Sequence, residues 1–216
     1  MHIPINHQDA PWKLKGEGFI LVYNFDKDWV MEHGFLTEEQ KRNFKGGFGF
    51  VMLVDYRSSP IGPYYELLFI PGKFEGSNRY SITKIYVDTK SSKINGRSNW
   101  GIPKETQPFI WQSRGKTTSI GVGEEADPVL FCKISHRGIS FPVTTKILPI
   151  KLIQQLEDKI FLTDPAGNGW AKSAKLESIK VNPIHFPDIS KQKPLFAFRV
   201  APFTMHFPTP NITLSR

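Results

Sequence analysis

Short apolar runs broken by glycine and proline limit what this 216-residue chain can fold into. The runs at 48–56, 64–70 and 79–88 are rich in β-branched and aromatic residues, and the last of them alternates its side chains between two faces. Each gap between the runs carries turn-forming residues, such as Pro60 and Gly72. Because gaps this short leave no room for a crossover helix, the pattern predicts antiparallel hairpins.

The remaining runs extend the same pattern, and helical signals are few. Further strands are predicted at 19–23, 109–112, 117–122, 129–135, 172–181 and 195–200. Residues 37–42 are typical of a capped helix start, and residues 148–156 could form a short helix entered near Pro149. The sequence therefore predicts a mainly β (α+β) fold: a curved antiparallel sheet or barrel with a few covering helices, in a single domain over residues 1–216.

The chain is strongly basic but carries no nucleic-acid motif. Lys and Arg number 28 against 20 Asp and Glu, which gives a net charge of +8. These basic residues are scattered rather than gathered in a dense run, so we expect a solvated surface and no nucleic-acid partner. A positive field would also favour an anionic ligand.

The sequence features that bear on the compartment favour the cytoplasm. The sequence shows neither an apolar run of signal-peptide length near its N-terminus nor a segment long enough to span a membrane, so no membrane partner is expected. The single cysteine, Cys132, can form no internal disulfide and stands in an apolar run, which is typical of a small buried side chain. A reducing cytoplasm is therefore the expected compartment.

Three patterns that suggest a cofactor or a metal fail on their spacing. The Gly-Lys-Thr at 115–117 lacks the glycine that a phosphate-binding loop needs five positions earlier, where Ile110 stands. The Gly-rich stretch at 121–126 is followed at once by Asp127 and Pro128 instead of a helix, and its acidic pair would repel a pyrophosphate. The six histidines show no metal-ligand spacing. We therefore expect neither a cofactor nor a metal.

One stretch of the sequence carries chemical information, and it centres on Glu66 and Lys104. Glu66 stands in the middle of an apolar strand, where an inward-facing carboxylate is costly unless it is paired or protonated. Considered alone, it would more commonly face solvent. Lys104 follows the apolar run at 100–103, and a lysine after a proline is commonly a surface residue.

Taken together, the two parts resemble the acetoacetate decarboxylase family. The shared motifs are a Gly-x-Tyr-x-Glu strand at 62–66, a Tyr-x-Asp strand end at 86–88, and a Gly-Arg pair at 96–97 that leads into Pro103 and Lys104. The resemblance implies that the curved antiparallel sheet closes into a cone-like barrel and that the protein forms homo-oligomers.

The resemblance also assigns roles to single residues. It places Lys104 at the Schiff-base lysine and Glu66 at the active-site glutamate, and it makes Tyr64, Arg97 and Trp100 candidates for substrate binding. In this family a neutral lysine amine attacks the substrate carbonyl, so its pKa must lie far below the ordinary value of about 10.4. Burial and a nearby cation lower such a pKa, and acetoacetate decarboxylase is a known example. The implied function is a Schiff-base lyase acting on a small keto acid or another carbonyl compound.

Three positions depart from the family pattern. Glu105 stands where the decarboxylases carry a second lysine, although successive extended residues point to opposite faces, so it can point away from Lys104. The arginine expected to meet the substrate carboxylate falls near Gly16, and a second glutamate falls near Val51. These departures favour aldol, retro-aldol or dehydration chemistry over decarboxylation of acetoacetate. The other candidates for the missing charge are Arg57, Lys93 and Arg97.

Two classes of function therefore stay open. The first is the Schiff-base enzyme, and the second is a binding protein that keeps the barrel and holds a carbonyl compound without reacting. Burial of Lys104 beside Glu66 would favour the enzyme. An exposed Lys104, or one paired with Glu105, would favour the binding protein.

Overall fold

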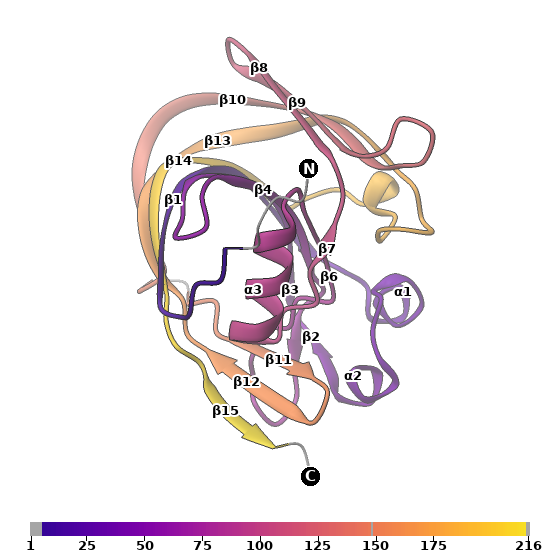
Figure 1. Ribbon diagram of the computed structural model, residues 1–216. Helices are drawn as coiled ribbons and strands as arrows, with labels where there is room; N and C mark the ends of the chain where they lie inside the picture. The colour runs from indigo at the N-terminus through magenta and orange to yellow at the C-terminus, as the bar shows by residue number, and fades with distance from the viewer. Residues whose placement is uncertain (1–5, 148, 215–216) are drawn as a thin grey trace.

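A ten-stranded sheet dominates the computed structural model, which describes residues 6–147 and 149–214. The sheet curls into a half-barrel (Figure 1). All neighbouring strands pair antiparallel except β6 and β7, which are parallel, so the predicted mainly β fold with a curved antiparallel sheet is confirmed. In spatial order the strands are β7 (Glu105–Thr106), β6 (Lys84–Val87), β4 (Tyr64–Ile70), β3 (Phe48–Ser58), β1 (Trp12–Asn24), β14 (Phe196–Phe207), β13 (Ala166–Val181), β10 (Pro128–Thr144), β9 (Thr117–Gly123) and β8 (Phe109–Arg114).

Two smaller sheets and a few helices complete the fold. One small sheet joins β11 (Leu152–Leu156), β12 (Lys159–Thr163) and β15 (Asn211–Leu214), and the other joins β2 (Phe44–Gly46) to β5 (Lys73–Phe74). The helices are α1 (Lys27–His33), α2 (Glu38–Asn43), α3 (Lys90–Trp100) and a 3-10 turn at Ile189–Lys191.

The capped helix start predicted at residues 37–42 is confirmed by α2. The Thr37 hydroxyl accepts a hydrogen bond from the backbone N–H of Gln40, and the Gln40 side chain accepts one from the backbone N–H of Thr37. This reciprocal capping box satisfies two backbone donors that a helix start otherwise leaves without partners.

Two predictions of local structure are wrong. Residues 152–156 form strand β11 rather than part of a helix, because they pair with β12 and extend the small sheet; Leu148, where the predicted helix begins, lies outside the described residues. The strand predicted at 79–88 is regular only over Lys84–Val87. Ser81 and Ile82 are adjacent yet both buried, so the chain leaves the strand alternation there.

The main sheet buries a hydrophobic core on each face. Phe19, Leu53 and Leu67 belong to the first core, and Tyr56 and Leu68 belong to the second. This division follows from the strand period of two, which sends successive side chains to opposite faces.

The helices divide between the two cores in the same way. Val30 of α1 lies in the first core, whereas Trp100 of α3 lies in the second. Figure 1 shows α3 inside the curve of the sheet, between β1 on one side and β6 and β7 on the other, with α1 and α2 beyond β6 and β7. The second core is therefore the one that α3 closes.

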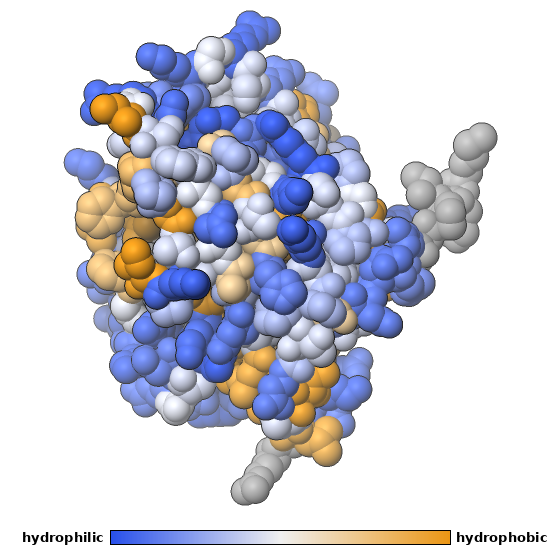
Figure 2. All heavy atoms as spheres, turned by 90° about the vertical axis from the view of Figure 1, so that its left-hand side faces the viewer, coloured by the Kyte–Doolittle hydropathy of each residue, from blue (hydrophilic) through white to orange (hydrophobic). Residues whose placement is uncertain are grey.

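The face of the molecule where β1, β10, β13 and β14 lie is mostly polar, with apolar side chains gathered locally. Figure 2 looks onto this face, and hydrophobic residues collect at its left margin and again near its lower edge. Exposed aromatic residues on these strands include Phe141, Trp170 and Phe196. No helix in the described ranges is both long enough and apolar enough to cross a membrane.

Candidate active site

The turn after α3 fixes the position of Lys104. Gly101 adopts a left-handed conformation with φ of 64°, which ends the helix, and the backbone N–H of Ile102 donates to the Gly96 carbonyl at 3.2 Å. The backbone N–H of Lys104 then donates to the Ile102 carbonyl at 2.7 Å, around Pro103. The chain therefore reverses within four residues and directs the Lys104 side chain back onto α3.

Gly96 makes room for the stem of Lys104. A Cβ atom at position 96 would lie 2.6 Å from Lys104 Cδ and 2.8 Å from Cε, so any side chain there would force the lysine stem to shift. The lysine stem therefore crosses α3 at the one position of this turn that has no side chain. Lys104 is only 4% exposed as a result.

Glu66 meets the lysine amine from the opposite side of the second core. It lies in β4 between Val54 of β3 and Val87 of β6, its cross-strand neighbours, and is 4% exposed. Its Oε2 lies 2.8 Å from Lys104 Nζ. Considered alone, the sequence favoured an exposed Glu66; it faces inward instead, because the amine of Lys104 compensates its charge.

Ser92 and Tyr64 complete the surroundings of the amine. Lys104 Nζ donates a hydrogen bond to Ser92 Oγ at 3.1 Å and lies 5.0 Å from the centre of the Tyr64 ring. An ammonium over an aromatic face is stabilised electrostatically. The amine is therefore held by a carboxylate, a hydroxyl and a ring.

Two buried tyrosines flank the ion pair on the sheet side. The Tyr56 hydroxyl donates to Glu66 Oε1 at 3.4 Å, and the Tyr56 and Tyr64 rings lie 4.7 Å apart. Burial, and then the negative charge of Glu66, raise the pKa of both phenols well above the ordinary value. Both hydroxyls therefore stay protonated at neutral pH, so each can donate a hydrogen bond.

The sequence assigned no role to Ser92, Gly96 or Tyr56, although Gly96 belongs to the Gly-Arg pair at 96–97. Ser92 and Gly96 lie one turn apart on the buried face of α3, which the sequence did not predict as a helix because this face is small and polar rather than apolar. Tyr56 could have been found, since it follows Val54 by two residues on a strand that the hairpin pairs with Glu66.

The three candidate substrate-binding residues lie in different places. Tyr64 lies against the amine, as described. Trp100 packs edge-on against Trp12 at 5.0 Å, and its indole N–H donates to the Pro208 carbonyl at 2.7 Å. Arg97 is half-buried on α3. Within the described part of the chain, neither Arg97 nor Trp100 has a hydrogen bond or ion pair with Lys104 or Glu66.

Glu105 points away from the candidate site. Its Oε1 lies 2.7 Å from Lys84 Nζ, and Glu105 belongs to β7, where the chain is extended. Successive residues of an extended chain point in opposite directions, so Lys104 and Glu105 reach different partners. The residue that replaces the family's second lysine therefore does not contact the amine of Lys104.

The other two departures also have structural causes. Gly16 lies at a bulge in β1, and a Cβ there would be 2.0 Å from the Asp55 carbonyl oxygen, so no side chain fits. Val51 belongs to the first core and therefore faces away from Glu66. The position of β3 directly opposite Glu66 is Val54, which is apolar.

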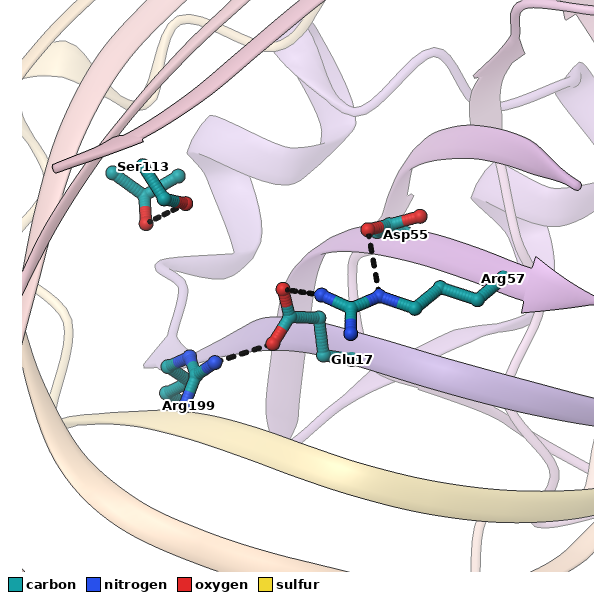
Figure 3. A network of polar contacts seen from close by, with 6 residues as sticks. Glu17, Asp55, Arg57, Ser113 and Arg199 are labelled. Atoms are coloured by element: carbon teal, nitrogen blue, oxygen red, sulfur yellow. Dashed lines mark hydrogen bonds and ion pairs between the residues drawn. The ribbon is translucent and has the colours of Figure 1, made fainter.

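A separate polar network occupies the other face of the sheet (Figure 3). Glu17 accepts from both Arg57 and Arg199, and Arg57 also donates to Asp55 at 3.3 Å. Glu17, Asp55 and Arg57 are on the face of β1 and β3 that points away from Glu66. The Arg57 charge is thus used away from Lys104.

Two further groups bear on the chemistry. Cys132 is fully buried, and burial raises the pKa of its thiol to about 12, so it stays protonated and unreactive near neutral pH. In the described ranges no three His, Cys, Asp or Glu side chains are grouped closely enough to hold a metal ion; His2, one of the six histidines, lies outside them.

Comparisons with known proteins bear on the fold. No protein-family model matches the sequence, and no curated protein matches it either. Solved structures do match. Acetoacetate decarboxylase from Legionella pneumophila superposes with a TM-score of 0.71 at 15% identity, covering 99% of this chain and 92% of that chain.

Two further enzymes superpose over nearly the whole chain. The enduracididine biosynthesis enzyme MppR has a TM-score of 0.68 at 14% identity, covering 96% of this chain and 89% of that chain. An acetoacetate decarboxylase-like enzyme from Sphingomonas wittichii RW1 has a TM-score of 0.70 at 11% identity, covering 97% and 95%. The chain therefore has the acetoacetate decarboxylase-like fold.

Proposed function

We propose that this protein is a Schiff-base-forming lyase that acts on a small keto acid or another carbonyl compound through Lys104. The observation that carries the proposal is the buried pair of Lys104 and Glu66, with 2.8 Å between its nitrogen and oxygen. This is the arrangement that favours the enzyme over the binding protein, since the lysine is neither exposed nor paired with Glu105.

The pair supplies a route to the neutral amine that the reaction needs. Transfer of one proton from Lys104 Nζ to Glu66 Oε2 converts two buried charges into two neutral groups, and burial favours neutral forms. The free amine then adds to the substrate carbonyl carbon. Loss of the carbonyl oxygen as water gives an imine whose protonated form accepts the electron pair of the neighbouring bond that breaks.

The surrounding groups orient this chemistry. Ser92 fixes the direction of the amine, and Glu66 lies close enough to deliver a proton to the departing water or to take one from the substrate. Tyr56 holds the other Glu66 oxygen. Lys104 and Glu66 would be the catalytic residues, and Ser92 and Tyr56 would position them.

The structural neighbours support carbonyl chemistry in this fold without fixing it here. MppR has been solved with pyruvate bound and with the condensation product of pyruvate and imidazole 4-carboxaldehyde. One fold can carry several activities, so the argument for this chain rests on its own residues.

Trapping with borohydride tests the proposal. The protein is incubated with acetoacetate, pyruvate or one of a panel of aldehydes and ketones, reduced, and mapped by peptide mass. We expect a reduced adduct on Lys104 that is absent from Lys104→Ala and kept in Lys93→Ala, which removes a lysine of the neighbouring helix α3. A folded protein that forms no adduct with any compound would refute imine catalysis.

A non-catalytic carbonyl-binding protein is the second candidate. The observation in its favour is the closure of the site, since Lys104 and Glu66 are each 4% exposed and a substrate must displace part of their surroundings to reach them. Reversible binding of a carbonyl compound, detected by calorimetry without any reduced adduct, would favour this candidate.

We also propose that the protein is a single domain over residues 1–216, forms homo-oligomers and is located in the cytoplasm. Sedimentation of the purified protein measures the oligomeric state directly.

A further inference from the structure

The charges of the candidate site are balanced before any substrate enters. Lys104 contributes one positive charge and Glu66 one negative charge, 2.8 Å apart. The cross-strand neighbours of Glu66 are Val54 and Val87, and the two phenols beside the pair are neutral at ordinary pH. The site therefore has no charge left over for a charged substrate.

Two nearby cations have their own partners elsewhere. Lys84 pairs with Glu105, and Arg57 pairs with Glu17 and Asp55 across the sheet. The bulge at Gly16 leaves no room for a side chain of either sign. The buried residues of α3 are Ser92, Asn95, Gly96 and Trp100, none of which carries a charge. Lys93 and Arg97 are half-buried on the same helix, and among the described residues neither has a hydrogen bond or ion pair with Lys104 or Glu66.

We propose that the site takes an uncharged aldehyde or ketone rather than a keto acid; this rests on the proposed imine chemistry at Lys104. When the amine adds to the carbonyl and water leaves, the protonated imine carries the single positive charge that the ammonium carried before. Glu66 balances that charge. A substrate carboxylate would add a second negative charge that no described side chain of the site offsets, at a cost that burial increases.

The substrate class also narrows the reaction. Without a carboxylate there is no carbon dioxide to leave, so the imine must accept electrons from another bond. That bond is a carbon–carbon bond in a retro-aldol step, which releases a second carbonyl compound, or a carbon–hydrogen bond whose proton Glu66 accepts. Both steps balance within the substrate and the pair, and neither needs an oxidant or a reductant.

A matched pair of compounds tests the charge argument. Pyruvate and pyruvamide share a skeleton and differ mainly in the charge of the group next to the ketone. Each is incubated with the protein and cyanoborohydride, and the rate of Lys104 reduction is measured by peptide mass. Each rate is divided by the rate at which the same compound is reduced onto the side-chain amine of free Nα-acetyl-lysine. This division removes the difference in intrinsic reactivity between the two ketones.

We expect the corrected rate to favour pyruvamide by roughly tenfold or more, the effect of two like charges a few ångströms apart at a partly screened site. Glu66→Gln removes the balancing charge and should shift the ratio towards pyruvate. Glu105→Gln removes a carboxylate that points away and should leave the ratio unchanged. A ratio near one, or in favour of pyruvate, in the unaltered protein would overturn the substrate class while imine formation stands. No adduct from either compound, in a folded protein that also forms none with the panel of aldehydes and ketones, would overturn both proposals.

Discussion

At the scale of single residues, the ion pair of Lys104 and Glu66 makes each partner dependent on the other. Both side chains are buried, so removing one leaves the other as an uncompensated charge in an apolar core. Replacing both with apolar side chains of similar volume removes that problem. The pair therefore adds little net stability, which is compatible with the proposed role in chemistry.

This dependence predicts the stability of the variants. Glu66→Leu and Lys104→Met should each lower the free energy of unfolding by about 3–5 kcal/mol, and the double variant should recover most of that loss. Urea denaturation followed by circular dichroism measures all three. Glu105→Gln is the matched control, because the ion pair of Glu105 with Lys84 is partly exposed and should contribute no more than about 1 kcal/mol. A double variant as unstable as the two losses added together would contradict this account.

The close contact of Gly96 with Lys104 gives a second prediction. Alanine normally favours a helix over glycine by about 1 kcal/mol. Gly96→Ala should nevertheless destabilise the protein and reduce adduct formation at Lys104, because the new Cβ would lie 2.6 Å from the lysine stem. Ser98→Ala, at an exposed position of the same helix, should keep both properties. Thermal unfolding and the trapping assay separate the two variants, and an unchanged Gly96→Ala protein would show that the lysine can move aside.

The sequence identified the two residues that form the pair but not the residues that hold them. Glu66 and Lys104 stand in motifs that resemble a family. Gly96 stands in such a motif too, but its contact with Lys104, like the hydrogen bond of Ser92, becomes apparent only once α3 is known to be a helix. The role of Gly96 depends on a distance to a side chain eight residues later, which no sequence pattern contains.

At the scale of elements, α3 is held from outside by the N-terminal segment. The Asn95 side chain accepts a hydrogen bond from the Gln8 backbone at 2.8 Å and donates to the carbonyls of Asn6 and Ser91. Asn95 lies next to Gly96 on the buried face of the helix. The segment around Gln8 therefore covers the helix that carries Ser92.

Removing this clamp should release the segment. We expect Asn95→Ala to lower stability by about 1–3 kcal/mol, since it leaves backbone groups without partners. Amide hydrogen exchange at Gln8 should accelerate by roughly tenfold or more. Asn99→Ala removes one hydrogen bond to the Gln8 carbonyl but not the one from its amide, so it should have the smaller effect. Equal exchange rates in both variants would show that the segment is held by other contacts.

Helices and strands could be predicted where apolar residues dominate a segment. They could not be predicted where contacts with distant segments decide between helix and strand. The strands at 48–56 and 64–70 are continuous apolar runs, and β3 and β4 contain them. Residues 152–156 carry a Leu-Ile-Gln-Gln-Leu sequence that suits either a helix or a strand. They become a strand because β12 offers a pairing edge.

At the scale of the whole molecule, every tyrosine contributes to one pH response. Burial is the first cause that raises the pKa of all six tyrosines, which are Tyr23, Tyr56, Tyr64, Tyr65, Tyr80 and Tyr86. The unfolded chain begins to lose these phenolic protons near pH 10, whereas the folded protein keeps them to higher pH. The resulting stabilisation is fully present below about pH 10 and is lost as the pH rises through the folded values.

We therefore expect the free energy of unfolding to fall steeply above pH 10. Each fully buried phenol should contribute a slope of about 1.4 kcal/mol per pH unit. Urea midpoints at several pH values, with tyrosinate absorbance, measure this response. Tyr64→Phe should flatten the slope more than Tyr65→Phe, because Tyr64 is buried and Tyr65 is half-buried. A flat profile up to pH 12 would contradict the argument.

The overall architecture could be predicted from the strand period and the spacing of turns. The burial of both faces of the sheet could not. An alternating strand normally has one wet face, and in β4 nearly every residue is buried. The second face is covered by α3 and by β11, which contribute Trp100 and Leu152 to the second core, and their positions depend on contacts far apart in the sequence.

The two-sided sheet also sets which length changes the chain can tolerate. Tyr65 and Glu66 are adjacent yet face different cores. An insertion of one residue into β4 before Glu66 would turn the Glu66 carboxylate to the face where Trp111 lies, and the Lys104 amine would then face the ring of Tyr65. An insertion of two residues would leave the carboxylate on its present face and only move it along the strand. We infer that relatives with an active pair can differ by two residues, but not by one, in the distance along the chain from the β3–β4 turn to the glutamate.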